Sequence, residues 1–258
     1  MVLTIDVGNS NIVLGVFEND DIKFIARMST VHNFTTDEIA ANLYSVLNVH
    51  NTDFTQIHGA IISSVVPQLT SALSAAVKTI TGVTPLVVGP GMKTGINIKI
   101  DNPAQLGSDL LVDGVAASAL YPKPVIIADM GTATTLTVVD ANNNLLGGAI
   151  CPGVRTSLNA LIEKTAQLPQ INLESPKKVI GTNTVDCIRS GVIFGNACML
   201  DGMIDRIEAQ LGQKCFVVAT GGLSDEICKQ TRHHVEHNPT LLIQGLYILY
   251  KKNTHVKE

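Results

Sequence analysis

A strand-turn-strand unit occurs twice in this chain, and this repeat limits the fold more than any other feature. The first copy, residues 2–17, has its turn at Asp6–Asn11, and the second, residues 125–139, has its turn at Asp129–Thr134. In both copies an apolar strand ends in Asp-x-Gly, small polar residues follow, and a second apolar strand begins. A recurrence near the middle of a 258-residue chain predicts two similar domains that each offer one turn to a shared cleft.

The chemistry of the first turn favours a phosphate ligand. Asp6 ends the strand, Gly8 is free to adopt a positive φ angle, and Asn9–Asn11 are three small polar residues. Such a turn can aim backbone N–H groups and side-chain donors at one polyphosphate, whose Mg²⁺ the carboxylate could hold. This stretch alone is explained equally well as an ordinary Asn-rich hairpin turn. Two such turns that grip one phosphate chain form a much more specific pattern.

Composition excludes several functional classes. The net charge of −4, the pI of about 6.0, the scattered basic residues and the absence of Trp argue against nucleic acid and anionic membranes as partners. The sequence contains no apolar run near the ~18 residues of a membrane helix. Asp6 interrupts the first apolar stretch, which is unlike a signal peptide. Five cysteines without a C-x-x-C pair favour reduced, mostly buried thiols. We therefore expect a cytoplasmic protein.

The pattern of the first half predicts three strands, a helix, a strand, a helix and a strand, which is the order of a ribonuclease-H-like unit. Helices are expected to begin at Thr36 and Pro67. Residues 110–120 suit a helix that links the halves. We place the domain boundary near Tyr121-Pro122, which divides the chain into domains 1–121 and 122–258.

The second half repeats the strand meander and then differs. A long helix at residues 185–211 is rich in Gly and Ala, and its small residues would allow close packing against a second subunit. Thr220-Gly221-Gly222 follows a strand and opens another helix, and a last helix follows Asn238-Pro239. The predicted fold class is α/β, with two tandem ribonuclease-H-like (actin-type) domains and a nucleotide cleft between them.

An ordered set of motifs resembles the type III pantothenate kinases over nearly the whole chain. The motifs are Asp6-x-Gly-Asn-Ser-Asn11, Asn102-Pro103-x-x-Leu-Gly-x-Asp109, Asp129-x-Gly-Thr-Ala133, Gly147-Gly-Ala-Ile-x-Pro-Gly153, Thr184 and Thr220-Gly-Gly222. The resemblance implies a fold of the acetate and sugar kinase, Hsp70 and actin type. It also implies ATP-dependent phosphorylation of pantothenate, the first step of coenzyme A synthesis. A cytoplasmic homodimer that needs Mg²⁺ and a monovalent cation, K⁺ or NH₄⁺, is implied as well.

Phosphoryl transfer needs positioned phosphates, neutralised charge and an oriented hydroxyl. The residues expected to bind ATP are Asp6, Val7, Gly8, Asn9, Ser10, Asn11, Ile12, Val13, Gly131, Thr132, Gly221 and Gly222, with Asp6 nearest the Mg²⁺ and the last two at adenosine. Asp109 is the expected catalytic base. The resemblance implies Asp129 as a ligand of the monovalent cation and Ile100, Gly107, Ser108, Asp109, Leu110 and Thr184 as acceptor contacts.

Each of these residues also has a plainer explanation. Gly221 and Gly222 could form a simple strand-to-helix turn. Ser108 or Asp109 could merely cap the helix that follows. A residue such as Asp129 at a strand end could serve local backbone bonds, and so could Thr184 at a helix end.

Two acceptor positions depart from the family pattern. The family usually reads Gly-Ala-Asp-Arg where this chain has Gly107-Ser108-Asp109-Leu110, and it usually has Tyr in place of Ile100. Leu cannot replace the donors of Arg, and Ile has no hydroxyl. Asp113 adds a carboxylate that would repel an acidic acceptor if it faced the pocket. A kinase with another acceptor, and a degenerate nucleotide-binding or regulatory homologue, therefore stay open as alternatives.

Three histidines near the C-terminus, His233, His234 and His237, invite comparison with a metal site. No nearby Cys completes a ligand set, and Asn238-Pro239 limits any helix there. A solvated loop is the preferred interpretation.

Overall fold

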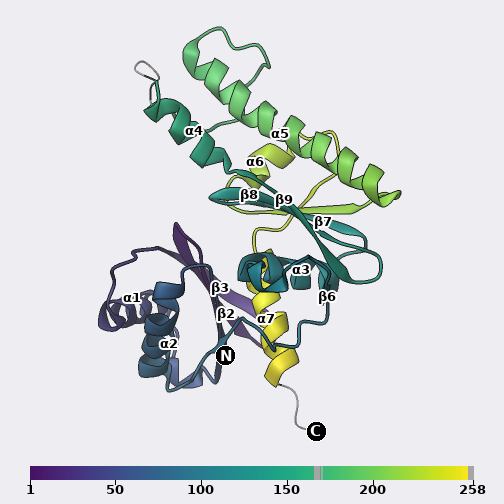
Figure 1. The fold of residues 1–258 in the computed structure, drawn as a ribbon. Coiled ribbons are helices and arrows are strands. Elements are labelled where there is room, and N and C mark those ends of the chain that lie inside the picture. Colours follow the sequence, from purple (N-terminus) through teal and green to yellow (C-terminus); the bar gives the residue numbers. More distant parts are fainter. Residues whose placement is uncertain (166–168, 170, 255–258) are drawn as a thin grey trace. The chain divides into compact units, whose positions relative to one another are not determined.

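The computed structural model describes residues 1–165, 169 and 171–254, which form two compact units (Figure 1). Unit 1 comprises Met1–Ile96, Asp101–Ala116 and the C-terminal helix. Unit 2 comprises Asn97–Ile100 and the described residues of Ala117–Thr240. None of the helices in the described ranges combines the length and the apolar character that crossing a membrane requires.

Unit 1 is built on a five-stranded sheet with the order β3-β2-β1-β4-β5. Its strands are β1 (Val2–Val7), β2 (Asn11–Glu18), β3 (Asp21–Ser29), β4 (Gly59–Ser64) and β5 (Leu86–Val87). Its helices are α1 (Thr36–Val49), α2 (Pro67–Thr81), α3 (Ser108–Leu120) and α7 (Leu241–Thr254), with short turns η1 (Phe54–Gln56) and η2 (Pro103–Gln105). The last four residues of α3 are assigned to unit 2.

The core of unit 1 follows from strand alternation. Leu3, Ile5 and Val7 point to one face of β1 and pack with the apolar faces of α1 and α2, which lie side by side (Figure 1). The other face, which carries Thr4 and Gly15, is covered by α7.

Unit 2 repeats this sheet and adds one strand, with the order β11-β10-β7-β8-β9-β6. Its strands are β6 (Asn97–Ile98), β7 (Val125–Met130), β8 (Ala133–Val139), β9 (Asn144–Pro152), β10 (Phe216–Thr220) and β11 (Glu236–His237). Its helices are α4 (Val154–Glu163), α5 (Thr184–Leu211) and α6 (Ser224–Cys228). Residues of all three helices pack with β7, β8 and β10 in one core. The expected pair of ribonuclease-H-like sheets is confirmed.

The compact units depart from the expected division at residue 121 in the placement of α7. The expected boundary near Tyr121-Pro122 places this helix in the second domain. It packs instead on β1, β2 and β4 of unit 1. Gly15 and Gly59 make this close approach feasible, because a side chain at either would collide with Ile243 or Tyr250 of the helix. A second departure is β6, a two-residue strand that pairs in parallel with β9 and places residues 97–100 in unit 2.

The expectation that the cysteines are mostly buried is wrong. Cys187 and Cys198 are exposed, and Cys151, Cys215 and Cys228 are half-buried. The two exposed cysteines belong to α5. This 28-residue helix buries one face in the core and leaves other residues exposed. All five are free thiols, as expected.

Candidate functional site

The first phosphate turn joins β1 to β2 and is held by backbone and by one side chain. The Gly8 amide donates to the Asn11 carbonyl at 3.0 Å. Thr30, at the end of β3, donates through its hydroxyl to the Gly8 carbonyl at 2.7 Å and through its amide to the Ser10 carbonyl at 3.0 Å. Thr30 was not expected at the site, because its role comes from strand pairing rather than from a local motif.

The expected ATP-binding residues of this turn differ in exposure. Asn9, Ser10 and Asn11 are exposed, and Asp6 is half-buried at the end of β1. Val7 is fully buried and Ile12 nearly so, and both side chains belong to the core. These two residues can therefore offer a ligand only their backbone groups.

The second phosphate turn joins β7 to β8 and has the same short backbone bond, from the Gly131 amide to the Ala133 carbonyl at 3.0 Å. Its support comes from the start of α4. The Gly153 amide and the Thr156 hydroxyl both donate to the Thr132 carbonyl, at 3.1 and 2.7 Å. Gly131 and Thr132 are exposed, so the face of this turn that is not covered by α4 is open. Sequence reasoning placed Gly153 in a motif but gave it no role.

Gly221 and Gly222, both expected at adenosine, differ in their surroundings. Gly221 has a φ of 95°, and a Cβ there would lie 2.6 Å from the Met130 carbonyl and 2.7 Å from the Asp129 carboxylate. Its glycine is therefore required by the fold itself, whether or not a ligand binds. A Cβ on Gly222 would meet nothing within 4 Å. A ligand contact is thus better tested at Gly222 than at Gly221.

Asp109 lies in the first turn of α3 and is half-buried. Because the helix begins at Ser108, the cap position belongs to Gly107 and the expected alternative of a simple N-cap does not hold. The Asp109 carboxylate does accept a local hydrogen bond, from the Leu110 amide at 2.9 Å. A side chain on Gly107 would collide with this carboxylate, so the glycine keeps its space open.

The residues expected at the acceptor come from both units. Gly107, Ser108, Asp109 and Leu110 belong to unit 1, whereas Ile100 and Thr184 belong to unit 2. Ile100 is half-buried. If Gly147 carried a Cβ, this atom would lie 3.5 Å from Ile100 Cγ2, so the two residues are close neighbours. Thr184 is exposed at the start of α5, where the Asp186 amide donates the capping hydrogen bond to the Asn183 side-chain oxygen at 2.9 Å. Thr184 is therefore not needed to cap this helix.

Asp113, the additional carboxylate of α3, is only 1% exposed. It lies one turn beyond Asp109 and is enclosed by the unit rather than open to solvent. The repulsion of an acidic acceptor that we considered would require a more accessible carboxylate.

His233 contacts a side chain of α5, which the expected solvated loop would not do. Its Nε2 lies 2.9 Å from Asp205 Oδ1, and with Glu208 these residues bring three donor atoms within 4.8 Å of one another. The Lys214 ammonium, however, already bonds the Glu208 carboxylate at 2.6 Å. Burial alone would raise the pKa of Glu208, but the bonds from Lys214 and the Cys215 amide outweigh it and lower this pKa. The network joins α5 to the segments that follow it, and we assign it no metal.

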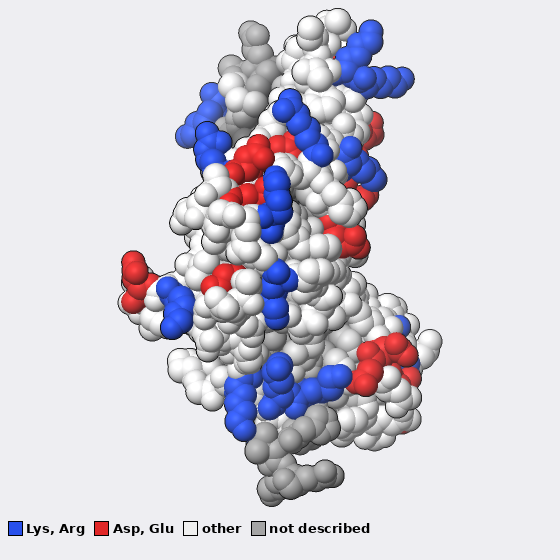
Figure 2. Space-filling model, turned by 90° about the vertical axis from the view of Figure 1, so that its right-hand side faces the viewer, with Lys and Arg blue, Asp and Glu red and all other residues white. Residues whose placement is uncertain are grey.

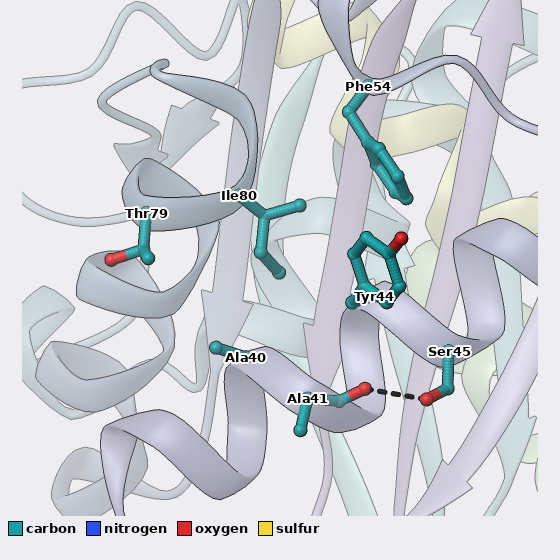
Figure 3. A pocket seen from close by; sticks show the side chains of 7 residues that line it. All are labelled: Ala40, Ala41, Tyr44, Ser45, Phe54, Thr79 and Ile80. Atoms are coloured by element: carbon teal, nitrogen blue, oxygen red, sulfur yellow. Dashed lines mark hydrogen bonds between the residues drawn. The ribbon is translucent and has the colours of Figure 1, made fainter.

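An apolar hollow lies between α1, α2 and η1, and its lining includes none of the expected site residues (Figure 3). The stacked rings of Tyr44 and Phe54 form one side of it. Its lining carries no charged group that could hold a phosphate or an acid. Basic and acidic side chains are interspersed among uncharged ones on the face that Figure 2 shows. Neither feature competes with the two turns as a nucleotide site.

Comparison with known proteins identifies relatives of this chain. The family model described as type III pantothenate kinase matches residues 2–206. The type III pantothenate kinase of Moorella thermoacetica is 40% identical over 98% of this chain and 100% of its own length. A candidate Baf family transcriptional activator of Campylobacter jejuni is similar in structure, with a TM-score of 0.64 at 17% identity over 98% of this chain and all of that one. A candidate 2-dehydro-3-deoxygalactonokinase of Sinorhizobium meliloti has a TM-score of 0.60 at 12% identity, over 100% of this chain and 98% of that one.

Proposed function

Because the chain belongs to the type III pantothenate kinase family, we propose that it transfers the γ-phosphoryl group of ATP to the terminal hydroxyl of pantothenate. The product is 4′-phosphopantothenate, and the reaction is the first step of coenzyme A biosynthesis. The observation that carries the proposal is the full-length match at 40% identity, together with both Asp-Gly turns and Asp109 in their expected elements.

The nucleotide takes its phosphate contacts from both turns. In unit 1, the exposed Asn9–Asn11 side chains and the backbone of residues 7–13 are the donors available to it. In unit 2, Gly131 and Thr132 are exposed, and α4 holds their backbone in place. Gly222 has the open space that a nearby adenosine needs. A turn whose shape is fixed before the ligand arrives loses little entropy on binding.

Asp109 orients the acceptor hydroxyl and accepts its proton as the phosphorus–oxygen bond to the acceptor forms. Its place in the first turn of α3 and its half-buried carboxylate suit this role. In the same transfer, the bond between this phosphorus and the oxygen that leaves with ADP breaks. Positioning and electrostatic stabilisation supply most of the rate in such reactions, because the protein has little covalent chemistry to perform.

The donor atoms fit the implied metal ions. Asp6 offers a hard carboxylate oxygen at the end of β1, which is the ligand type that Mg²⁺ prefers. Asp129 ends β7 in the same way beside the Met130 carbonyl, and oxygen ligands of this kind suit K⁺ or NH₄⁺. Bound with ATP, Mg²⁺ neutralises phosphate charge. These two carboxylates are this chain's contribution to the two sites.

Ile100 and Leu110 favour a second candidate, a kinase of the same fold that accepts another small alcohol. Loss of a charged donor typically weakens binding by a few kcal/mol. For pantothenate we therefore expect a high KM, which Leu110→Arg should lower if pantothenate is the acceptor. A lower KM for a neutral alcohol would instead support the second candidate.

A homodimer in the cytoplasm completes the proposal. Gly191 and Gly195 lie on an exposed side of α5 where a Cβ would meet nothing within 4 Å, so a second helix can approach closely. Unit 2 also exposes large apolar side chains, among them Ile150 at 73% and Ile180 at 82%. Light scattering on the purified chain measures its mass, and a monomeric mass across the working concentration range would contradict this part.

The deciding experiment is an ADP-release assay with Mg²⁺, K⁺ and ATP, with pantothenate and with a panel of small alcohols. We expect pantothenate-dependent turnover that falls by at least about a hundredfold in Asp109→Asn, because the amide cannot accept the proton. ATP binding by this variant should be unchanged, which calorimetry checks. Turnover with another alcohol only would select the second candidate, and ATP binding without any turnover would select a non-catalytic role.

A further inference from the structure

Two serine hydroxyls join the end of β4 to the start of α3. Ser63 Oγ donates to Ser108 Oγ at 3.0 Å, and Ser108 Oγ donates to the Ser64 carbonyl at 3.1 Å. Ser63 is fully buried and Ser108 is half-buried. The Ser108 hydroxyl thus both accepts and donates, and this pair of bonds fixes the first residue of the helix against the strand.

This link lies beside the first phosphate turn. β4 pairs in parallel with β1, and Ser63 is the register partner of Asp6. Paired residues of neighbouring strands direct their side chains to the same face of a sheet, so Asp6 and Ser63 share one face. Ser108 directly precedes Asp109. The bonded serines therefore connect the strand position next to the phosphate-turn carboxylate with the residue before the proposed base.

We propose that Ser63 and Ser108 are positioning residues that hold Asp109 at a fixed place relative to Asp6. The inference rests on the proposed function, because it assigns a consequence to the position of the base. A hydroxyl at residue 108 is a departure of this chain, since the family motif usually has Ala there. Ser108 stands two residues before Leu110, the position at which the Arg of the family is also missing.

The start of α3 is also held by its buried residues Leu111 and Val112, and the hydrogen bonds there are mostly local. The Leu111 amide bonds to the Gly107 carbonyl at 3.1 Å within the helix, and Gly107 itself has no side chain to pack. The Asp109 carboxylate accepts a bond from the Leu110 amide at 2.9 Å within the same turn, so its direction depends on where this first turn is held. A displacement of about 1 Å at a reacting group can lower a rate by about a hundredfold.

The neighbouring Ser64 provides a matched control. Among the described residues its hydroxyl bonds within its own segment, donating to the Val66 carbonyl and accepting from the Val66 amide, both at 3.1 Å. Its backbone carbonyl, which accepts from Ser108, is unchanged by substitution of the side chain. Ser64→Ala therefore removes a hydroxyl from the same strand end without breaking the tether.

The test compares Ser63→Ala with Ser64→Ala in the ADP-release assay. Ser63→Ala removes one of the two bonds and leaves the Ser108 bond to the Ser64 carbonyl. We expect kcat to fall about tenfold with the KM for ATP within about twofold of the parent value, because the turn is intact while the loss of one bond lets the base shift. Ser64→Ala should keep the parent kcat. The double variant Ser63→Ala/Ser108→Ala should lose no more than Ser108→Ala, since both changes break the same bond. An unchanged kcat in Ser63→Ala, or an equal loss in Ser64→Ala, would overturn the proposal.

Amide hydrogen exchange separates this inference from the proposed function. If the parent chain shows no pantothenate-dependent turnover, the proposed function fails and the exchange rates decide the tether alone. Faster exchange at residues 108–111 in Ser63→Ala, with parent rates in Ser64→Ala, supports it. Equal rates in the two variants contradict it.

Discussion

The two phosphate turns have the same backbone but different supports. Both lie between antiparallel strands and both close with one amide-to-carbonyl bond of 3.0 Å, from Gly8 in unit 1 and from Gly131 in unit 2. The first turn is held by the Thr30 side chain and backbone, and the second by the start of α4. Both units therefore have the same turn shape for a phosphate. Each unit stabilises its turn with the segment that follows its third strand, Thr30 after β3 and α4 after β9.

The neighbouring parallel strand shows a second difference. In unit 1, Asp6 is paired with Ser63, which is bonded to the start of α3. In unit 2, Asp129 is paired with Thr220, and Gly221 follows so closely that no side chain fits there. The first strand end thus faces a helix with a carboxylate, and the second ends in a backbone turn. This difference matches the division of roles that we propose, with the base in unit 1 and adenosine in unit 2.

The largest effect is expected for Gly153→Ala. A Cβ at this position would collide with the carbonyl oxygens of Gly131 and Thr132, so the second turn must move. We expect a loss of about 2–3 kcal/mol in the free energy of unfolding, as for other overpacked sites, and weaker ATP binding. Denaturant unfolding and calorimetry measure both. Gly89→Ala is the control, since the nearest atom to its Cβ would be 3.9 Å away, and an equal loss there would contradict the explanation.

Gly131→Ala separates ligand binding from stability. Its Cβ would lie 3.6 Å from the nearest protein atom, the Ala133 carbonyl oxygen, which is an ordinary contact. We expect an unchanged melting temperature and a KM for ATP raised about tenfold, which corresponds to about 1.4 kcal/mol. Gly8→Ala in the first turn should raise this KM too. Unlike Gly131→Ala it should lower stability slightly, because its Cβ would lie only 3.2 Å from the Asn11 carbonyl. A parent-like KM in both variants would remove the turns from the nucleotide site.

Thr30→Val tests the side-chain support of the first turn. The substitution removes the 2.7 Å bond to the Gly8 carbonyl and keeps the shape of the side chain. A typical loss for one such bond is about 1 kcal/mol, measured by urea unfolding. We expect a smaller rise in the KM for ATP than in Gly131→Ala, since the backbone bonds of the turn persist. A loss as large as that of Gly153→Ala would mean that the supports are not as different as we infer.

The smallest effect at neutral pH is expected for Tyr247→Phe in α7, the helix that covers the sheet of unit 1. Tyr247 stacks on Phe17 at 4.0 Å and donates to the Asp20 carboxylate at 2.6 Å. Burial, followed by this bond, raises the pKa of Tyr247 from 10.0 to about 12. The folded chain therefore holds the phenol proton more tightly than the unfolded chain, and this stabilisation is complete below pH 10 and is lost as the pH rises from 10 to about 12.

Tyr247→Phe keeps the ring stack and removes the titrating group. The difference in unfolding midpoint between parent and variant should shrink as the pH rises from 9 to 12, in urea titrations at fixed salt. Tyr44→Phe, at a position that is 52% exposed, is the control. A difference that stays constant over this range would show that the phenol does not contribute through its proton.

Many of the elements could be predicted because their signals are local. The capping box of α1 at Thr35 and Glu38, the Pro at the start of α2 and the alternating strands needed no distant contact. β6 could not be predicted, because two residues carry no periodicity and form a strand only where β9 offers its edge. Likewise, Thr30 and Thr156 have no motif of their own. Their roles exist only where folding brings their hydroxyls to a turn.

The sequence by itself determined the repeated strand-turn-strand unit, the positions of both Asp-Gly turns and the family to which the chain belongs, since these depend on residues that are adjacent in the chain. Only the tertiary structure decided that α7 packs on the first sheet, that Gly221 is required by its protein neighbours and that Ser63 reaches Ser108. These features arise from contacts between segments that are far apart in sequence. Such contacts depend on which surfaces have room for each other, and the order of residues does not state this.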